Sequence, residues 1–147
     1  MITWTEVNRN LSSINSNYLL LREKFVKFAI VFESQLKEPN IKVKGISTEL
    51  FLDKNYFNVS FAGKEIWFEF RTCINDGGLA GMVVCYLEPD FPKTEPICLN
   101  TINFSSTGRT DLRDASDGDI LNITYDTSAV YIIFNILNDA FSGYLSY

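Results

Sequence analysis

The longest regular pattern in the chain is a stripe of apolar residues within residues 3–38. Its members recur at alternating steps of three and four: Trp4, Val7, Leu11, Ile14, Tyr18, Leu21, Phe25, Phe28 and Phe32. That spacing places all of them on one side of an α-helix. Thr3 and Glu6 are spaced as a capping box, and Pro39 disfavours helical geometry at Glu38. The pattern therefore predicts one long N-terminal helix.

After residue 39 the apolar period changes from about 3.6 to 2, which is typical of β-strands. The runs predict strands at residues 46–52, 56–61, 65–71, 80–87 and 97–104, and a short one at 120–123. A bulge at Gly45 is expected to bring Ile41 and Val43 onto the face of the first strand. Residues 105–119 are the most irregular stretch.

Two turns are marked by glycine. Residues 75–78, Asn-Asp-Gly-Gly, form one of them. A two-residue loop of Gly63 and Lys64 is expected between the second and third strands. This loop predicts three apolar pairs across the hairpin: Phe61 with Ile66, Val59 with Phe68, and Phe57 with Phe70.

A second helical stripe lies near the C-terminus. It runs over residues 128–144, with Asp126 or Thr127 as the candidate N-cap and Tyr144 as its last member. The short links between strands favour antiparallel neighbours. We therefore predict a single α+β domain over residues 1–147, an antiparallel β-meander of four to five strands. The long N-terminal helix and the C-terminal helix are expected to pack on one face of the sheet.

The first helix is too long for the domain it belongs to. At about 1.5 Å per residue it is roughly 50 Å long, whereas a domain of this size is ~38 Å across. The stripe residues Val7, Leu11, Ile14 and Tyr18 are therefore expected to form a homodimer contact. The alternative is that the helix bends at the weak helix formers of residues 15–17 and packs on its own sheet.

The net charge of −5 is unevenly distributed. Residues 1–72 carry ten basic and eight acidic side chains, while residues 73–147 carry three and ten. No basic stripe is present, so nucleic acid is not an expected partner, whereas a cationic protein is. Plain solubility is the simpler explanation of the acidic half. No run is long and apolar enough to span a membrane, and three cysteines without CxxC spacing favour a reducing cytoplasm.

The chain has no histidine, which removes the commonest general base and metal ligand. Four carboxylates crowd one loop, at Asp111, Asp114, Asp117 and Asp119. They could hold Ca²⁺ or Mg²⁺, but EF-hand spacing fails, so a solvated acidic loop is the better interpretation and no metal or cofactor is expected. Trp67 with Arg71 has the composition of an interface anchor, although the ring could simply cover the open face of the sheet.

Three functions remain open. The first is a non-enzymatic interaction module that self-associates through its N-terminal helix, of which a toxin-neutralising, antitoxin-like protein with an acidic loop is one form. The second is a carrier with an apolar pocket between sheet and helices. The third is an enzyme that uses paired carboxylates, which two Asp or Glu side chains converging in a cleft would favour.

Overall fold

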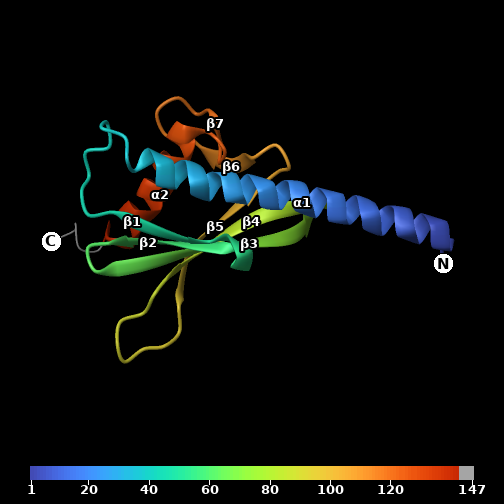
Figure 1. Ribbon diagram of the computed structural model, residues 1–147, viewed down its shortest axis with the longest axis horizontal. Helices are drawn as coiled ribbons and strands as arrows, with labels where there is room; N and C mark the ends of the chain where they lie inside the picture. The colour runs from blue at the N-terminus through green and yellow to red at the C-terminus, as the bar shows by residue number, and fades with distance from the viewer. Residues whose placement is uncertain (143–147) are drawn as a thin grey trace.

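The computed structural model describes residues 1–142 and confirms the α+β class (Figure 1). A long helix precedes a seven-stranded antiparallel sheet, and a second helix follows it. In chain order the elements are α1 (Trp4–Gln35), β1 (Ser47–Phe51), a 3₁₀ turn (Leu52–Lys54), β2 (Tyr56–Phe61), β3 (Lys64–Asn75), β4 (Gly78–Leu87), β5 (Ile97–Phe104), β6 (Arg109–Arg113), β7 (Ile120–Asn122) and α2 (Asp126–Ala140).

The helix α1 runs for 32 residues without a break. Its capping box forms as expected: the Glu6 amide donates to the Thr3 hydroxyl at 3.2 Å, and the Thr3 amide donates to the Glu6 carboxylate at 3.0 Å. The expected weak point at residues 15–17 stays helical. Asn17 does not compete for the helix backbone there, because its side-chain amide donates to the Leu79 carbonyl at 3.3 Å. The bend is therefore the wrong alternative.

The strands follow one another in a simple meander, β1 to β7, so the expected topology is correct but the strand count was too low. The strand missed altogether is β6, which lies in the stretch taken as irregular. In this strand the inward-facing residues are Thr110 and Leu112, and they alternate with charged residues. Because only one of the two is apolar, the sequence shows no clear apolar alternation. The expected bulge is wrong as well: Gly45, at φ +84°, lies before the first strand, and residues 41–46 form no strand.

The β2–β3 register differs from the prediction by two residues. Phe61 pairs with Lys64, and the pairs on the core side are Val59 with Ile66 and Phe57 with Phe68. The loop residues are Ala62 and Gly63, with φ of 50° and 78°, the two positive values of a type I′ turn. Such a turn matches the twist of its strands. A shift of two keeps each side chain on its face, so alternation alone could not exclude it.

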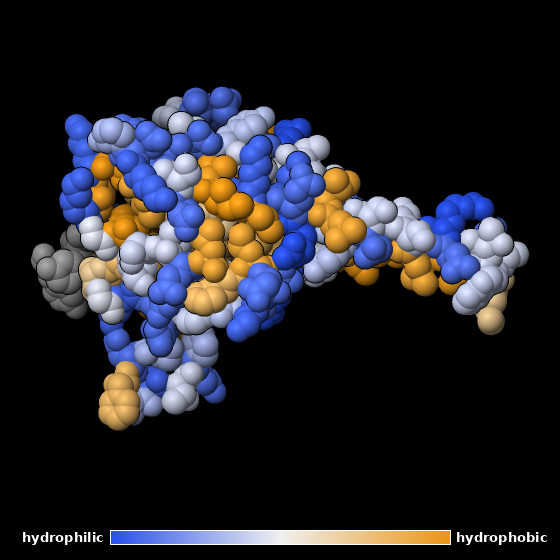
Figure 2. All heavy atoms as spheres, viewed as in Figure 1, coloured by the Kyte–Doolittle hydropathy of each residue, from blue (hydrophilic) through white to orange (hydrophobic). Residues whose placement is uncertain are grey.

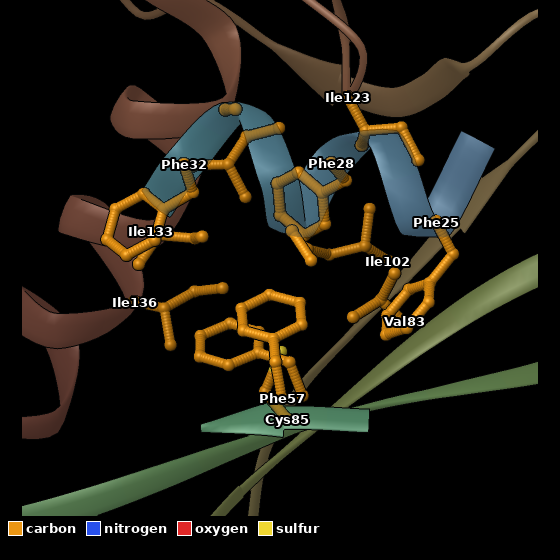
Figure 3. Packing of buried hydrophobic residues seen from close by; sticks show 14 of the residues in the cluster. Phe25, Phe28, Phe32, Phe57, Val83, Cys85, Ile102, Ile123, Ile133 and Ile136 are labelled. Atoms are coloured by element: carbon orange, nitrogen blue, oxygen red, sulfur yellow. The ribbon is translucent and has the colours of Figure 1, made fainter. Parts of the chain in front are cut away.

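Both helices cover one face of the sheet, and the core lies between the helices and this face. Figure 3 shows side chains from α1, α2 and the strands converging there. Phe25, Phe28 and Phe32 of α1 are fully buried, and the rings of Phe57 and Phe68 stack with centroids 4.8 Å apart. The aromatic residues that could line a carrier's pocket contact one another instead.

The helix α2 starts two residues earlier than expected. Tyr125 occupies the N-cap position without a side-chain hydrogen bond, so neither Asp126 nor Thr127 is the cap. The helix ends at Ala140, and the expected last stripe residue, Tyr144, lies outside the part of the chain that the structure describes. Ile133 and Ile136 of α2 are buried in the core, as Figure 3 shows.

Candidate functional site

The first candidate surface is the N-terminal part of α1, residues 4–17, which we call the projecting half. Figure 1 shows it extending beyond the end of the sheet. The stripe that is fully buried from Leu21 to Phe32 continues along it without cover. Trp4 is 77% exposed, Leu11 60% and Ile14 52%. Figure 2 shows apolar side chains along this half, apart from the body of the molecule.

The amount of exposed surface is unusual for a chain of this size. The accessible surface is 9446 Å². A compact monomer of the same mass exposes about 7,600 Å², so the excess is roughly 1,800 Å². The projecting half and the long β4–β5 loop both stand clear of the body in Figure 1, so both contribute to this exposed surface.

Tyr18 lies where the projecting half joins the body. Its ring contacts Phe70 of the sheet, with centroids 5.8 Å apart, and it remains partly exposed. Ile74, on the same face of β3 as Phe70, is exposed near the tip of the β3–β4 hairpin. The four stripe residues proposed from sequence, Val7, Leu11, Ile14 and Tyr18, therefore share one helix face that ends at this hairpin.

The second candidate surface is a cleft on the opposite face of the sheet. Its floor is aromatic: Trp67 and Tyr86 are cross-strand partners, and the Tyr56 ring lies 5.1 Å from Trp67. The β4–β5 loop, residues 88–96, forms its wall through Pro89, Lys93, Thr94 and Pro96. The open volume is about 690 Å³. We call this surface the aromatic cleft.

Trp67 and Arg71 both line the aromatic cleft, so the structure brings these two predicted residues together. It separates them from the α1 stripe, which faces the other side of the sheet. The guanidinium of Arg71 lies 5.9 Å from the centre of the Tyr86 ring and donates to Glu69 at 3.1 Å and 3.3 Å. The hydrogen bond with Glu69 raises the pKa of Arg71.

Two carboxylates meet at the edge of the aromatic cleft. Glu88 lines it, and its amide donates to the Glu65 carbonyl at 3.0 Å. The pKa of Glu65 is raised by burial, by a side-chain hydrogen bond with Glu88 and by the charges of Glu88 and Glu49. Asn58 donates its side-chain amide to Glu65. A close carboxylate pair is what the enzyme alternative requires, so that alternative stays a prediction.

Sequence reasoning missed Tyr56, Tyr86, Glu65 and Glu88. A signal for Tyr86 was available. The β3–β4 turn sits at Asp76 and Gly77, and counting back from it pairs Trp67 with Tyr86. The same count places Glu65 opposite Glu88, one position beyond the last paired residues Ile66 and Leu87, so a signal for the carboxylate pair was available as well.

The acidic loop makes most of its contacts with itself. Ser116 donates its amide to Asp114 at 2.7 Å, and the hydrogen bonds from Ser116 lower the pKa of Asp114. Asp117 accepts from the Asp119 amide at 2.9 Å, whereas Asp111 accepts from Asn103 at 3.3 Å. Within residues 1–142 these carboxylates do not gather into a group that could hold a metal ion. The toxin-neutralising role assigned to this loop stays a prediction.

The cysteines at positions 73, 85 and 98 are free, and each lies in a strand. Burial raises the pKa of the Cys85 thiol, consistent with a packing role.

Over residues 1–142, neither helix combines the length and the apolar content needed to cross a bilayer.

Comparisons with protein-family models, with curated proteins and with solved structures find no match. The function is therefore inferred from the two surfaces described above.

Proposed function

We propose that this chain is a non-enzymatic protein-interaction module that forms a homodimer through the projecting half of α1. The observation that carries the proposal is the continuity of one stripe. The same helix face is fully buried from Leu21 to Phe32, whereas Trp4, Leu11 and Ile14 are exposed and Val7 is half-buried. Contiguous apolar surface of this kind marks an interaction site in soluble proteins.

The stripe residues are spaced almost symmetrically about Leu11. They stand at positions 4, 7, 11, 14 and 18, so the distances along the helix are nearly equal on the two sides of Leu11. In an antiparallel pair, Leu11 meets Leu11 of the second copy, Val7 meets Ile14 and Trp4 meets Tyr18. A two-fold axis through Leu11 generates all of these contacts, as expected for an isologous interface.

Charge and helix stability support the same arrangement. The projecting half carries only Glu6 and Arg9, which the antiparallel pair places opposite Ser16 and Ser13, so no like charges meet. An isolated helix shorter than about 12–15 residues is marginal in water. The packed half of α1 supplies the helix nucleus, but the projecting half has little packing of its own, so a second surface would stabilise it.

The area available is sufficient for a stable dimer. If each copy buries about half of its excess surface, the two together bury roughly 1,800 Å². Stable interfaces bury about 1,200–2,000 Å² in total. Nearby apolar residues such as Ile74 extend the contact to the β3–β4 hairpin.

Sedimentation velocity on two matched variants tests the proposal. Ile14 and Leu20 are exposed to similar degrees, 52% and 47%, but lie on different sides of α1. We expect the wild type and Leu20→Asp to sediment at twice the 16.8 kDa chain mass, and Ile14→Asp at the chain mass. A wild type that is monomeric at high micromolar concentration would refute the dimer, and so would equal effects of the two variants.

A further inference from the structure

The aromatic cleft lies on the face of the sheet away from α1, so its role is independent of the proposed dimer. We propose that it binds a basic peptide segment of a partner protein, with lysine or arginine side chains over Trp67 and Tyr56 and beside Glu65 and Glu88. The rings, the carboxylates that form no salt bridge within residues 1–142, and the loop each support this occupant.

The floor of the cleft already holds one cation. Arg71 of the chain itself lies over Tyr86 and is anchored by Glu69. Aromatic faces attract guanidinium and ammonium groups, and the attraction grows when the cation is partly desolvated. The other end of the floor, formed by Trp67 and Tyr56, has the same chemistry but no cation of its own among residues 1–142.

Glu65, which lies on the same face of β3 as Trp67, and its neighbour Glu88 also lack a cationic partner among residues 1–142. In the part of the chain that the structure describes, the salt bridges join Lys64 to Asp90 and Arg71 to Glu69, and neither reaches Glu65 or Glu88. The two carboxylates repel each other, and Glu49 adds to this repulsion. A bound ammonium or guanidinium group would relieve it.

The charge around the cleft argues against the other common occupant of such a floor. Aromatic side chains on an open sheet also stack the bases of single-stranded nucleic acid. That function requires a positively charged groove along the phosphates. Among the lining residues, Glu69 and Glu88 balance Arg71 and Lys93. Glu65 and Glu49, which interact with each other, add two negative charges nearby, so the phosphates would meet no positive groove.

The β4–β5 loop favours a peptide over a small organic cation. Phe91 is 97% exposed on this loop. An exposed ring on the loop that forms the wall of the cleft gives an apolar anchor that a small ammonium ion could not use, whereas a peptide that extends along this loop could.

The test is fluorescence anisotropy with a fluorescein-labelled dodecapeptide of alternating lysine and alanine. We expect wild type to bind with a Kd on the order of 10–100 µM, more weakly at high salt. The double variant Glu65→Gln with Glu88→Gln should bind at least about tenfold more weakly, which corresponds to ~1.4 kcal/mol. Trp67→Leu should weaken binding as well.

The matched control removes the same two charges elsewhere. Glu23→Gln with Asp139→Asn changes exposed carboxylates of α1 and α2, on the other face of the sheet, and should leave the Kd within about twofold. Equal weakening by the control and by the cleft variant would overturn the proposal. It would also be overturned by a wild type that binds oligothymidylate but not the peptide, that binds tetramethylammonium as tightly as the peptide, or that binds none of these probes at millimolar concentration.

Discussion

The covered and projecting halves of α1 carry the same apolar stripe in different surroundings. In the covered half, Phe25, Phe28 and Phe32 lie against the sheet and α2, and each is fully buried. In the projecting half, Trp4, Leu11 and Ile14 continue the stripe where the sheet has ended. Identical spacing therefore has two outcomes. It stabilises the fold where the chain supplies a cover, and where the chain supplies none it is the surface through which we propose that a second copy binds.

The largest expected effect is on the free energy of unfolding, which should depend strongly on the covered half of α1 and weakly on the projecting half. Phe28→Ala should lower the free energy of unfolding by ~3–5 kcal/mol, because it opens a cavity in a filled core. Leu11→Ala should change the unfolding of the isolated subunit by less than about 0.5 kcal/mol. Urea denaturation at low protein concentration measures both. Similar losses for the two variants would mean that Leu11 is covered within its own chain.

The second effect is on assembly and uses the two tryptophans. Trp67→Phe leaves Trp4 as the only indole. Diluting this variant should shift its emission to longer wavelength as the dimer dissociates and Trp4 becomes exposed. Adding Leu11→Ala should raise the dilution midpoint by about tenfold or more, since Leu11 lies at the centre of the proposed interface. An emission maximum independent of concentration would contradict a dimer built on this stripe.

The third expected effect is an increase in the stability of the folded body, with no change in the proposed dimer contact. Ala62 has a φ of 50°, which costs energy for alanine, and Asn is preferred at this position of a type I′ turn. Ala62→Asn should raise the free energy of unfolding by about 0.5–1 kcal/mol. The dimer dissociation constant should not move, because the turn and the stripe share no contact. Thermal melting and sedimentation together check both expectations.

The smallest effect concerns the carboxylate pair. The pKa of Glu65 is raised in the folded protein, so its contribution to stability is fully present below the unfolded pKa and is lost as pH rises through the folded pKa. Glu88→Gln removes the repulsion and should stabilise the protein near pH 7 by roughly 0.5 kcal/mol, with little gain near pH 4. The control is Glu95→Gln, which removes one negative charge from an exposed position in the β4–β5 loop. It should show no such pH dependence.

Much of the fold followed from residue spacing alone. The α1 stripe, the Thr3 capping box and the alternating strands β2 and β3 are local patterns that no tertiary contact contradicted. The register of β2–β3 did not follow, because Ala62 is a rare choice at a position with positive φ. The strand β6 was missed because its inward residues are few and its pairing with β5 is short, at one Cα pair.

The candidate surfaces were predictable to different degrees. The projecting half needed only a comparison of helix length with domain size, so its residues were named from sequence. The aromatic cleft needed the β3–β4 register to place Tyr86 beside Trp67, and it needed the path of the β4–β5 loop. A loop path depends on contacts such as the ion pair of Lys64 with Asp90, which sequence spacing does not reveal.

Hydrogen exchange of the α1 amides at two protein concentrations tests the central claim most directly. In the proposed dimer the projecting half packs against a second helix, whereas in a monomer it has little packing of its own, so its amides open more readily. We expect protection of residues 8–17 to rise with protein concentration, while protection of residues 25–32 stays constant. Protection of residues 8–17 that is independent of concentration, in a protein that sediments as a monomer, would contradict the account.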